Sequence, residues 1–326
     1  MKKQTEMDFP GKILLFGEYG ILLNSMALSV PFYRFSGRFS FADDSDSFLS
    51  ENVAFPINEL KRLYNFLKSG MEQFDFLNLE NFRNDLERGL FFESSIPFGS
   101  GLGSSGALTA AVYAGYVINA DAFGLTETRE HLSRIESCFH GVSSGIDPLT
   151  SYLKKPVLFE PPTKKIKTAD LSPFLESHTL FLIQTHHNGK TGELVSHFLG
   201  KCDDPDYLDQ MNAAYIPLIA QTIWAIVSGD DATFELLMKR YSRFQLSFFE
   251  KMIPVTMKKH MEYGIETGDF YLKLCGSGGG GYMLAITRNS SKTQNYFKQN
   301  QLDYIIVNPI EIQTSNFQLF NHYTNI

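Results

Sequence analysis

Cysteine is scarce in this sequence. The 326 residues include three cysteines, Cys138, Cys202 and Cys275, which lie far apart and form no C-x-x-C pair. This pattern excludes a disulfide framework and a cysteine-based zinc site, and it is typical of a reducing compartment. We therefore expect a cytoplasmic protein in which each cysteine is a small hydrophobic residue or a bystander.

Positive charge is also in short supply. Lysine and arginine number 29 against 36 aspartates and glutamates, which gives a formal net charge of −7. The chain has no dense run of basic residues that would draw it onto a phosphate backbone. Nucleic acid is therefore not an expected partner.

Long hydrophobic runs are absent as well. The longest apolar stretch, residues 216–227, is interrupted by Pro217, Gln221 and Thr222 and is too short to cross a bilayer. Residues 1–10 contain no apolar segment of the kind that a secretory signal requires. We expect neither a signal peptide nor contact with a membrane.

Apolar and aromatic residues are present in the amounts of an ordinary globular protein. They make up 43% of the chain, and the 29 phenylalanines and 15 tyrosines supply large side chains for a core. A chain of this length forms one large domain or two closely packed ones. We expect an α+β fold with an N-terminal lobe, residues 1–165, and a C-terminal lobe, residues 166–326. The oligomeric state is open between a monomer and a homodimer.

Hydrophobic periodicity outlines the elements of both lobes. Alternation at residues 34–41 places the phenylalanines on one face, as a half-buried strand requires. The other expected strands are 12–16, 90–96, 157–159 and 180–184, and a hairpin joins 271–275 to 282–287. The expected helices span residues 57–74, 106–120, 126–139, 206–228, 231–252 and 255–267, with Thr126 capping the third of them.

A strand, a glycine-serine loop and a helix follow one another over residues 90–120. The loop reads Pro97-Phe98-Gly99-Ser100-Gly101-Leu102-Gly103-Ser104-Ser105. Glycines let backbone N–H groups approach an anion closely, and the free amides and the positive end of a helix dipole favour phosphate there. The serines are suited to capping the helix or to reaching a magnesium ion. A flexible loop with a serine N-cap is the alternative explanation.

Other nucleotide-binding patterns match this chain less well. Residues 99–104 lack the third glycine of the dinucleotide fingerprint, and no Gly-Lys-Ser/Thr follows them. Residues 276–281 match that fingerprint by letter, but a strand is predicted after them where the fingerprint requires a helix. We expect them instead at the tip of a hairpin that passes close to substrate or to the phosphate loop. Residues 188–191 are explained as an ordinary turn rather than the end of a Walker motif.

Two acidic residues flank a run of small residues in the middle of the chain. Glu136 lies beside the apolar stripe of the predicted 126–139 helix, so its carboxylate is expected to point inward unless it pairs with a lysine at the boundary. Asp147 follows in a tight turn, where the alternative is a helix N-cap. Two carboxylates near one site suit phosphoryl transfer, which uses a metal ligand and a nucleophile-orienting base. Lys12, at the start of a strand, is ambiguous by itself.

Three segments together resemble the superfamily of galactokinase, homoserine kinase, mevalonate kinase and phosphomevalonate kinase. They are Pro10-Gly11-Lys12-Ile13-Leu14-Leu15-Phe16-Gly17-Glu18-Tyr19, the phosphate loop continued to Ala107, and Lys273-Leu274-Cys275-Gly276-Ser277-Gly278-Gly279-Gly280-Gly281. Within the superfamily, Glu136 followed by His140-Gly141 and Ser144-Gly145-Ile146-Asp147 is similar to the mevalonate kinases. The resemblance spans most of the chain. It implies a two-lobed fold in which nucleotide and substrate meet in the cleft between the lobes.

The resemblance also implies roles for individual residues. Asp147 is expected to be the catalytic aspartate and Lys12 its basic partner, while Ser105 and Glu136 hold Mg²⁺. ATP is expected on the phosphate loop and the start of the helix behind it, and the substrate near a second set of residues. The nucleotide set is Pro97, Gly99, Ser100, Gly101, Leu102, Gly103, Ser104, Ser105 and Gly106, and the substrate set is Glu18, Tyr19, Ser144, Gly278 and Gly279.

The implied activity is transfer of a phosphoryl group from ATP to a small-molecule alcohol, the 5-hydroxyl of mevalonate, in isoprenoid precursor synthesis. Departures from the family pattern bear on the substrate rather than on the reaction class. Tyr19 replaces a histidine, Val142-Ser143 replaces Asn-Pro, and Ser277 and Tyr282 alter the third segment. A kinase of phosphomevalonate or of a sugar's anomeric hydroxyl is the alternative. A non-catalytic sensor is a further alternative, which the joint presence of a lysine, a base and a metal carboxylate disfavours.

Overall fold

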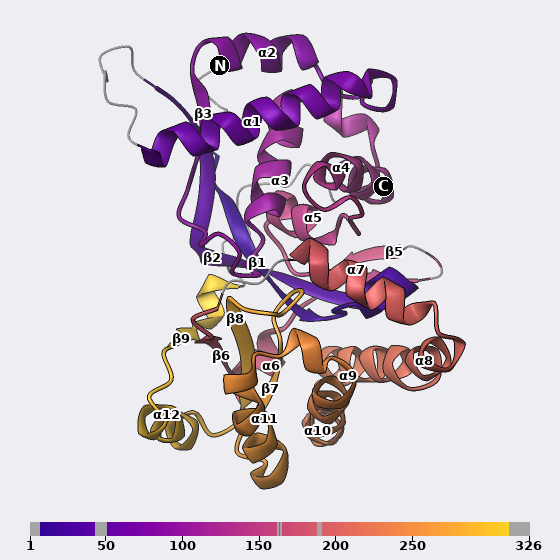
Figure 1. Ribbon diagram of the computed structural model, residues 1–326, viewed down its shortest axis with the longest axis vertical. Helices are drawn as coiled ribbons and strands as arrows, with labels where there is room; N and C mark the ends of the chain where they lie inside the picture. The colour runs from indigo at the N-terminus through magenta and orange to yellow at the C-terminus, as the bar shows by residue number, and fades with distance from the viewer. Residues whose placement is uncertain (1–6, 43–50, 162, 164, 188–190, 313–326) are drawn as a thin grey trace.

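Two antiparallel β-sheets, one from each half of the chain, form the frame of the structure (Figure 1). The computed structural model describes residues 7–42, 51–161, 163, 165–187 and 191–312. Helices pack on both sheets, and strands and helices alternate irregularly along the chain. The fold is therefore α+β, as the sequence predicts.

The first sheet is built around one long strand. Its strands are β1 (Phe9–Phe16), β2 (Ala27–Phe41), β3 (Leu90–Ser94), β4 (Val157–Glu160) and β5 (Lys165–Thr168). The order is β1-β2-β4-β5, and β3 pairs with the second half of β2. There Phe39 lies opposite Phe92 with ring centroids 6.0 Å apart, so the alternating phenylalanines do share one face. β5 spans the boundary predicted between the lobes 1–165 and 166–326. The division into these two lobes stays a prediction.

Five α-helices of the first half cover this sheet (Figure 1). They are α1 (Glu51–Ser69), α2 (Leu79–Glu87), α3 (Ser104–Tyr116), α4 (Leu125–His140) and α5 (Ile146–Leu153). α3 and α5 pack directly on β1 and β2. The buried face of α3 carries the small residues Ala107, Ala110 and Ala111, which lets the helix approach the sheet closely. The N-terminus of α3 is thereby fixed beside the start of β1.

The start of α4 differs from the expectation. The predicted cap, Thr126, lies inside the helix, and Gly124 is the N-cap residue. The Gly124 N–H donates a hydrogen bond to the Glu127 carboxylate over 3.0 Å. The Glu127 carboxylate in the first turn therefore accepts a hydrogen bond from a free N–H group at the helix start, and no threonine hydroxyl caps the helix. The predicted end of the helix at Gly141 is confirmed.

The second sheet belongs to the C-terminal half. Its order is β7 (Tyr271–Leu274), β8 (Tyr282–Thr287), β6 (Thr179–Gln184) and β9 (Tyr304–Val307), all antiparallel. β7 and β8 form the predicted hairpin, with the glycine run at its tip. The dinucleotide fingerprint is thus excluded by structure as well as by pattern, because a strand follows residues 276–281.

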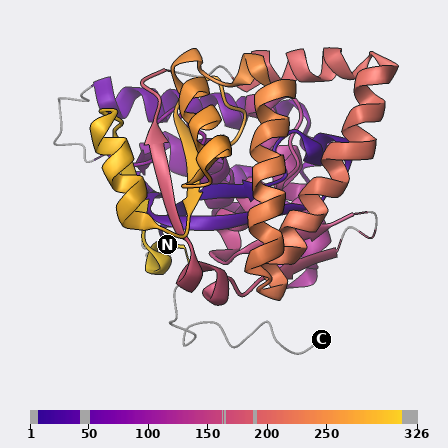
Figure 2. The same ribbon diagram turned by 90° about the horizontal axis from the view of Figure 1, so that it is seen from below.

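The helices of the second half surround this sheet, with α12 on one side of its strands and α9 and α10 on the other (Figure 2). They are α6 (Ser172–Ser177), α7 (Thr191–Cys202), α8 (Pro205–Gln210), α9 (Ile216–Ser228), α10 (Asp231–Phe248), α11 (Val255–Thr267) and α12 (Ser290–Gln299). A π-turn over Met211–Tyr215 joins α8 to α9, which confirms the predicted continuous helix. This segment, Pro205–Ser228, is long and apolar enough for a membrane span, yet 44% of its apolar window is buried in the fold.

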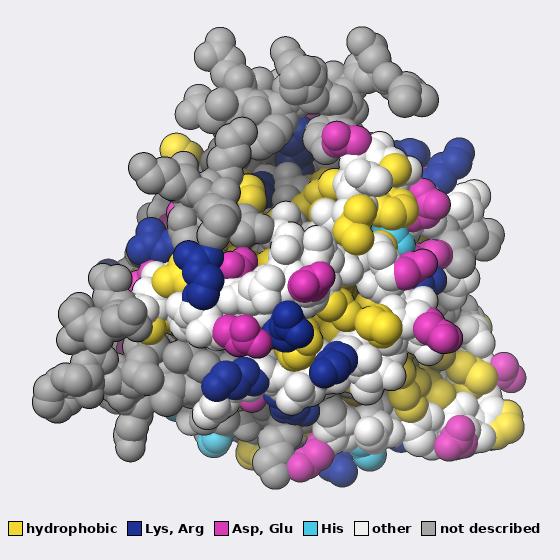
Figure 3. Space-filling view, turned by 90° about the horizontal axis from the view of Figure 1, so that it is seen from above, with side chains coloured by type: hydrophobic (Ala, Val, Ile, Leu, Met, Phe, Trp, Pro, Cys, Tyr) yellow, Lys and Arg dark blue, Asp and Glu magenta, His cyan; other side chains and the backbone are white. Residues whose placement is uncertain are grey.

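The surface above the first-half helices carries charge of both signs. Figure 3 shows Lys and Arg side chains interspersed with Asp and Glu on this face. Two such pairs lie on α1 and α2, where Arg62 and Glu59 are 3.8 Å apart and Arg83 and Glu87 are 3.6 Å apart. Exposed pairs of this kind contribute little stability. The expectation that this protein does not bind nucleic acid stays a prediction.

Candidate active site

An ion pair between β1 and α5 stands at the centre of the candidate site. The Lys12 ammonium lies 2.8 Å from a carboxylate oxygen of Asp147, and the exposed fractions of the two side chains are 3% and 30%. Burial by itself lowers the pKa of Lys12, but the neighbouring Asp147 carboxylate, together with Cys275 and Glu136, more than reverses this, so the pKa is raised above its usual value. Lys12 therefore stays charged, and Asp147 remains open to a ligand.

The glycine-serine loop covers this pair. The Lys12 N–H donates to the Leu102 carbonyl oxygen over 2.8 Å, which ties the loop to β1. Gly103 has a φ of +80°, and a Cβ there would lie 2.7 Å from the Lys12 Cγ. The loop thus passes directly over the lysine stem at a point where only glycine fits.

The N-termini of α3 and α5 meet at the same place. A Cβ on Gly106, in the first turn of α3, would lie 3.2 Å from the Asp147 carbonyl carbon. The N-cap residues are glycines with left-handed φ, Gly103 for α3 and Gly145 for α5, and neither helix has a side-chain cap. The alternatives of a serine cap at α3 and of an N-cap role for Asp147 are therefore both wrong. Asp147 is the second residue of α5, where the helix dipole favours a carboxylate.

A second carboxylate lies between the two helix starts. Glu136 on α4 is 4% exposed, and its Oε1 accepts a hydrogen bond from the Ser105 hydroxyl over 3.2 Å. Its Oε2 accepts one from the Ser143 hydroxyl over 2.5 Å. Burial, assisted by the negative charge of Asp147, raises the pKa of Glu136 to about 7. The inward direction expected for this side chain is confirmed, and its partners are serines rather than a lysine.

The tip of the β7–β8 hairpin closes over the phosphate loop from the other side. A Cβ on Gly101 would clash with the Cys275 carbonyl oxygen, and a Cβ on Gly281 would lie 2.5 Å from the Ser100 oxygen. The Tyr282 N–H donates to that same Ser100 oxygen over 3.3 Å. Of the two contacts expected for this tip, the structure shows the one with the phosphate loop.

Gly278 and Gly279, predicted to bind substrate, face a different neighbour. The Gly279 N–H donates to the Met252 carbonyl oxygen over 2.5 Å. A Cβ on Gly278 would lie 2.5 Å from the same oxygen. These glycines let the hairpin tip pack against the chain after α10, and their role in substrate binding stays a prediction.

Glu18, another predicted substrate residue, lies away from this group. Its side chain and that of Lys273 on β7 are both fully buried and form an ion pair. The other carboxylate oxygen accepts a hydrogen bond from the Tyr241 hydroxyl over 2.8 Å. Burial raises the pKa of Glu18 in spite of the nearby lysine. The structure therefore places Glu18 in a polar network between the two halves of the chain.

Tyr19 and Ser144 make different contacts within the protein. Tyr19 has a left-handed φ of +59°, and its hydroxyl donates to the Ser277 carbonyl oxygen over 2.6 Å. The ring packs on Phe198 at a centroid distance of 4.8 Å. The Ser144 carbonyl oxygen accepts a hydrogen bond from Arg129 over 2.8 Å. Both residues are near the glycine segments, and their substrate roles stay predictions.

Two hollows in the described surface differ in their relation to the site. The larger, about 270 Å³, borders the phosphate loop at Pro97, Phe98 and Ser100 and ends on the histidines that follow β6. Phe98 at its mouth is 80% exposed. This hollow therefore borders the phosphate loop and the hairpin tip, but Lys12, Ser105, Glu136 and Asp147 do not line it.

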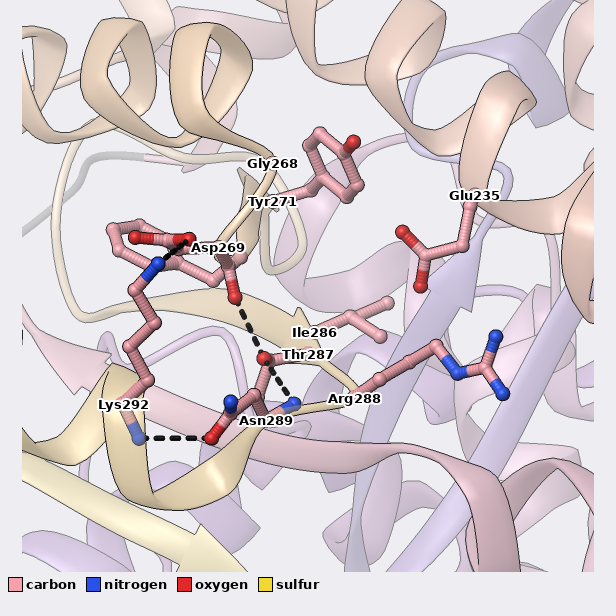
Figure 4. A pocket seen from close by; sticks show the side chains of 10 residues that line it. Glu235, Gly268, Asp269, Tyr271, Ile286, Thr287, Arg288, Asn289 and Lys292 are labelled. Atoms are coloured by element: carbon pink, nitrogen blue, oxygen red, sulfur yellow. Dashed lines mark hydrogen bonds and ion pairs between the residues drawn. The ribbon is translucent and has the colours of Figure 1, made fainter.

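The smaller hollow, about 180 Å³, lies at the end of β7 and β8 on the far part of the second half (Figure 4). Asp269 and Lys292 in its wall pair with each other over 2.6 Å. The carboxylate of Glu235, also in its wall, accepts a hydrogen bond from the buried His178 ring over 3.2 Å. The charges of this hollow are therefore partnered within the fold, and none of the predicted site residues lines it.

Sequence reasoning missed two polar residues that shape the site. Ser143 was noted as a departure from the family pattern, yet nothing in the sequence indicated its bond to Glu136. Lys273 opens the third family segment, so its presence was visible, but its pairing with Glu18 is a contact between residues 255 positions apart. Residues 188–190 of the rejected Walker-like turn lie outside the described residues.

The donor set fits a hard cation with few protein ligands. No group of three or more His, Cys, Asp or Glu side chains that could hold a metal occurs within the part of the chain that the structure describes. Ser105 and Glu136 instead offer two oxygens that already face each other. Magnesium is commonly held by one or two protein oxygens together with phosphates and water, so these residues fit a nucleotide-bound Mg²⁺.

Comparison with known proteins identifies proteins that this chain is similar to. Residues 60–155 match the family model described as GHMP kinases N terminal domain. That range contains Ser105, Glu136 and Asp147. A mevalonate kinase from Pyrococcus horikoshii is 26% identical over 313 residues, which cover 88% of this chain and 89% of that protein.

Solved structures share the fold over nearly the whole chain. The structure of L. major mevalonate kinase in complex with R-mevalonate superposes with a TM-score of 0.62 at 16% identity, covering 93% of this chain and 95% of that one. Streptococcus pneumoniae phosphomevalonate kinase in complex with phosphomevalonate and AMPPNP gives a TM-score of 0.63 at 15% identity, covering 92% and 99%. The expected resemblance to GHMP kinases and their α+β fold are confirmed, and an ATP-dependent kinase is the class of enzyme that these findings support.

Proposed function

We propose that this chain, whose N-terminal domain and fold are those of the GHMP kinases, transfers a phosphoryl group from ATP to the 5-hydroxyl of mevalonate. One observation carries the proposal. The buried Lys12 and the accessible Asp147 form an ion pair 2.8 Å long, at the point where the phosphate loop and the N-terminus of α3 converge. A lysine, a carboxylate and a phosphate-binding helix end are the parts that phosphoryl transfer to an alcohol requires.

Asp147 serves as the base in this proposal. Its side chain is 30% exposed, so a substrate hydroxyl can reach the carboxylate and give up its proton there as the phosphoryl group arrives. Lys12 is fixed by the loop above it and keeps its charge because Asp147, Cys275 and Glu136 together raise its pKa against the effect of burial. The ammonium offsets the negative charge that develops on the attacking oxygen and on the transferred group.

The phosphate loop holds the nucleotide. Gly103 keeps a side chain out of the space over Lys12, and Gly101 lets the loop pass close to the Cys275 carbonyl, so backbone amides can face the phosphates. The loop is fastened to β1 by the Lys12–Leu102 backbone bond and to the hairpin by the Tyr282–Ser100 bond. Because the loop is attached on both sides, its amides are fixed before the nucleotide binds. They can then stabilise the charge of the phosphates without a change in the loop.

Ser105 and Glu136 would hold Mg²⁺ together with the nucleotide phosphates. The ion supplies neutralisation of phosphate charge when it is bound. Glu136 is buried and aimed at Ser105, so the two oxygens need little rearrangement to serve as ligands. Because burial raises the pKa of Glu136 to about 7, the carboxylate is only partly ionised near neutral pH until a cation is present.

The choice of mevalonate is supported by the relatives and by the middle segment of the sequence. The Pyrococcus horikoshii relative bears the name mevalonate kinase and aligns over most of both chains. A phosphomevalonate kinase superposes equally well, so that substrate is the second candidate. The lobes at 1–165 and 166–326, the cleft between them, a homodimer and a cytoplasmic location accompany this proposal as predictions.

A coupled ADP-release assay on the full chain tests the proposal. ATP and Mg²⁺ are supplied with mevalonate, phosphomevalonate, homoserine or galactose, and we expect turnover with mevalonate to exceed that with each of the others. Turnover with another alcohol alone would contradict the substrate and keep the reaction class. ATP binding without turnover on any of the four would instead favour the sensor on this fold.

A further inference from the structure

Glu136 is held from both sides by hydroxyl groups. Ser105, at the start of α3, donates to one carboxylate oxygen over 3.2 Å, and Ser143, after α4, donates to the other over 2.5 Å. The glutamate is 4% exposed. Rotation of its carboxylate would therefore break at least one of two hydrogen bonds in a buried setting, where a lost bond costs most.

Ser143 makes a second hydrogen bond at the same oxygen. Its Oγ accepts a bond from the Gly145 N–H over 3.0 Å, and Gly145 is the N-cap residue of α5. Asp147 lies two residues further on, in the first turn of that helix. The single hydroxyl of Ser143 thus connects the carboxylate on α4 to the helix start that carries the proposed base.

The turn that carries Ser143 is braced against α4. The Ser133 hydroxyl donates to the Ser143 carbonyl oxygen over 2.7 Å, and Arg129 donates to the Ser144 carbonyl oxygen over 2.8 Å. Gly145 has a φ of +74°, and a Cβ there would clash with the Arg129 carbonyl oxygen. Contacts at three successive residues fix the turn, so the Ser143 hydroxyl has a defined position relative to Glu136.

We propose that Ser143 is a positioning residue, which fixes the Glu136 carboxylate in the orientation that holds Mg²⁺ and couples it to the start of α5. The inference rests on the proposed function. It is particular to this chain, because the proline that the family pattern has at this position carries no hydroxyl. Residues that orient metal ligands typically contribute roughly 10–100-fold to metal affinity. A hydroxyl that only stabilised the turn through Gly145 would leave metal affinity unchanged.

Three variants of the full chain separate these roles. Ser143→Ala removes the hydroxyl, Ser143→Thr keeps it, and Ser137→Ala is the matched control. Ser137 lies on the same helix as Glu136, and its hydroxyl bonds to the Arg134 carbonyl at the exposed surface over 2.6 Å. For each protein, Mn²⁺ affinity is measured by electron paramagnetic resonance on the ADP complex, and ADP affinity without metal is measured by calorimetry.

We expect Ser143→Ala to weaken Mn²⁺ binding to the ADP complex about 10-fold or more, with ADP affinity in the absence of metal unchanged. Ser143→Thr should restore Mn²⁺ binding to within a few-fold of wild type, and Ser137→Ala should match wild type. The Mg²⁺ concentration for half-maximal turnover should rise in parallel with the Mn²⁺ dissociation constant.

Two results would overturn the inference while the proposed function stands. One is wild-type Mn²⁺ affinity in Ser143→Ala, and the other is a Ser143→Thr protein as weak as Ser143→Ala. A wild-type protein that binds no Mn²⁺ in the presence of ADP and turns over no alcohol would remove the proposed function, and this inference with it.

Discussion

Two lysine–carboxylate pairs in this molecule have the same chemistry and opposite surroundings. Lys12 and Asp147 are 2.8 Å apart with exposed fractions of 3% and 30%, whereas the side chains of Lys273 and Glu18 are both at 0%. We refer to these as the open pair and the closed pair. Lys12 lies on β1 of the first sheet, and Lys273 lies on β7 of the second. Glu18, the partner of Lys273, belongs to the turn that follows β1.

The closed pair has no capacity left for a ligand. The Lys273 ammonium also donates to the carbonyl oxygens of Leu14 and Leu274, over 3.2 and 2.6 Å. The remaining oxygen of Glu18 is taken by Tyr241. Full satisfaction of this kind is the condition under which a buried ion pair is tolerated at all. The closed pair therefore joins the two halves of the chain.

In the open pair, one partner is held and the other is available. Lys12 is fixed beneath Gly103 by the loop, while nearly a third of the Asp147 side chain faces solvent. The comparison teaches that pairing with a lysine does not by itself mark a catalytic carboxylate. The difference lies in whether the remaining hydrogen-bonding capacity is satisfied by the protein, and substitutions at both pairs can test this.

The largest effect is expected at the open pair. Asp147→Asn removes the base but keeps the shape and an oxygen that can accept from Lys12, so turnover should fall roughly 10²–10⁴-fold. The melting temperature should fall as well, because the buried Lys12 ammonium loses its counter-charge. Steady-state ADP release and thermal unfolding measure the two quantities. Substantial residual turnover in this variant would show that another group accepts the proton. Both ion pairs would then have only a structural role.

The next effect is expected at the closed pair and on stability. Lys273→Met leaves the Glu18 carboxylate buried without its counter-charge, so the free energy of unfolding should drop by about 3–5 kcal/mol. The double variant Glu18→Gln/Lys273→Met should recover much of this loss, because no charge is left unpaired and the amide still accepts from Tyr241. Chemical denaturation of the single and double variants measures the difference.

The double variant also examines the predicted substrate role of Glu18. If that residue only joins the two halves, the folded double variant should retain a KM for the alcohol close to wild type. A KM raised by tenfold or more, with an intact unfolding transition, would instead return Glu18 to the substrate site and abolish the contrast between the two pairs.

A smaller effect is expected at the loop that lies between the pairs. Gly101 has a φ of +81° and faces the Cys275 carbonyl, two residues after Lys273. Gly101→Val combines a left-handed β-branched residue with a clash, each costing about 1–3 kcal/mol, so affinity for an ATP analogue should fall about 100-fold. Gly200→Ala is the control, because a Cβ at Gly200 would meet nothing within 4 Å. Unchanged affinity in Gly101→Val would move the phosphates elsewhere.

The open pair could be anticipated from the sequence and the closed pair could not. Lys12, Glu136 and Asp147 stand in short segments whose family resemblance implies a common site, and the structure brings their side chains together. The Glu18–Lys273 contact joins residues 255 positions apart, and neither periodicity nor composition carries information on such pairs. The resemblance did place Lys273 in a recognised segment, although without a partner.

Prediction of the elements failed where strands and helices are short or exposed. β5 is four residues long and mostly exposed, so it shows no alternation. β9 is also four residues long and was overlooked despite its apolar composition. The cap of α4 was misplaced because the prediction assigned it to Thr126, whereas glycines are the N-cap residues of both α3 and α4. The long periodic helices and the glycine hairpin were found, although the first helix spans Glu51–Ser69 rather than the predicted 57–74.

The smallest effect is a pH dependence that links Glu136 to the open pair. Burial, and then the charge of Asp147, raise the pKa of Glu136 to about 7, against opposing hydrogen bonds from Ser143 and Ser105 and the charge of Lys12. Between its ordinary value of 4.5 and about 7, the folded protein keeps a proton that the unfolded chain has released. Stability from this group is therefore present at acidic pH and is lost as the pH rises through that window.

Replacing the glutamate removes this dependence. The free energy of unfolding of wild type minus that of Glu136→Gln should decline by about 2–3 kcal/mol between pH 4.5 and pH 7 and then level off. Denaturant titrations of metal-free protein at a series of pH values measure the decline, with exposed Glu72→Gln as the control that should show none. In Asp147→Asn the pH range of this decline should end at a lower pH, because removing the neighbouring charge lowers the pKa of Glu136. If the pH range of the decline is the same in Asp147→Asn as in wild type, burial alone raises the pKa of Glu136. The charge of Asp147 would then have no effect on the Glu136 carboxylate beside it.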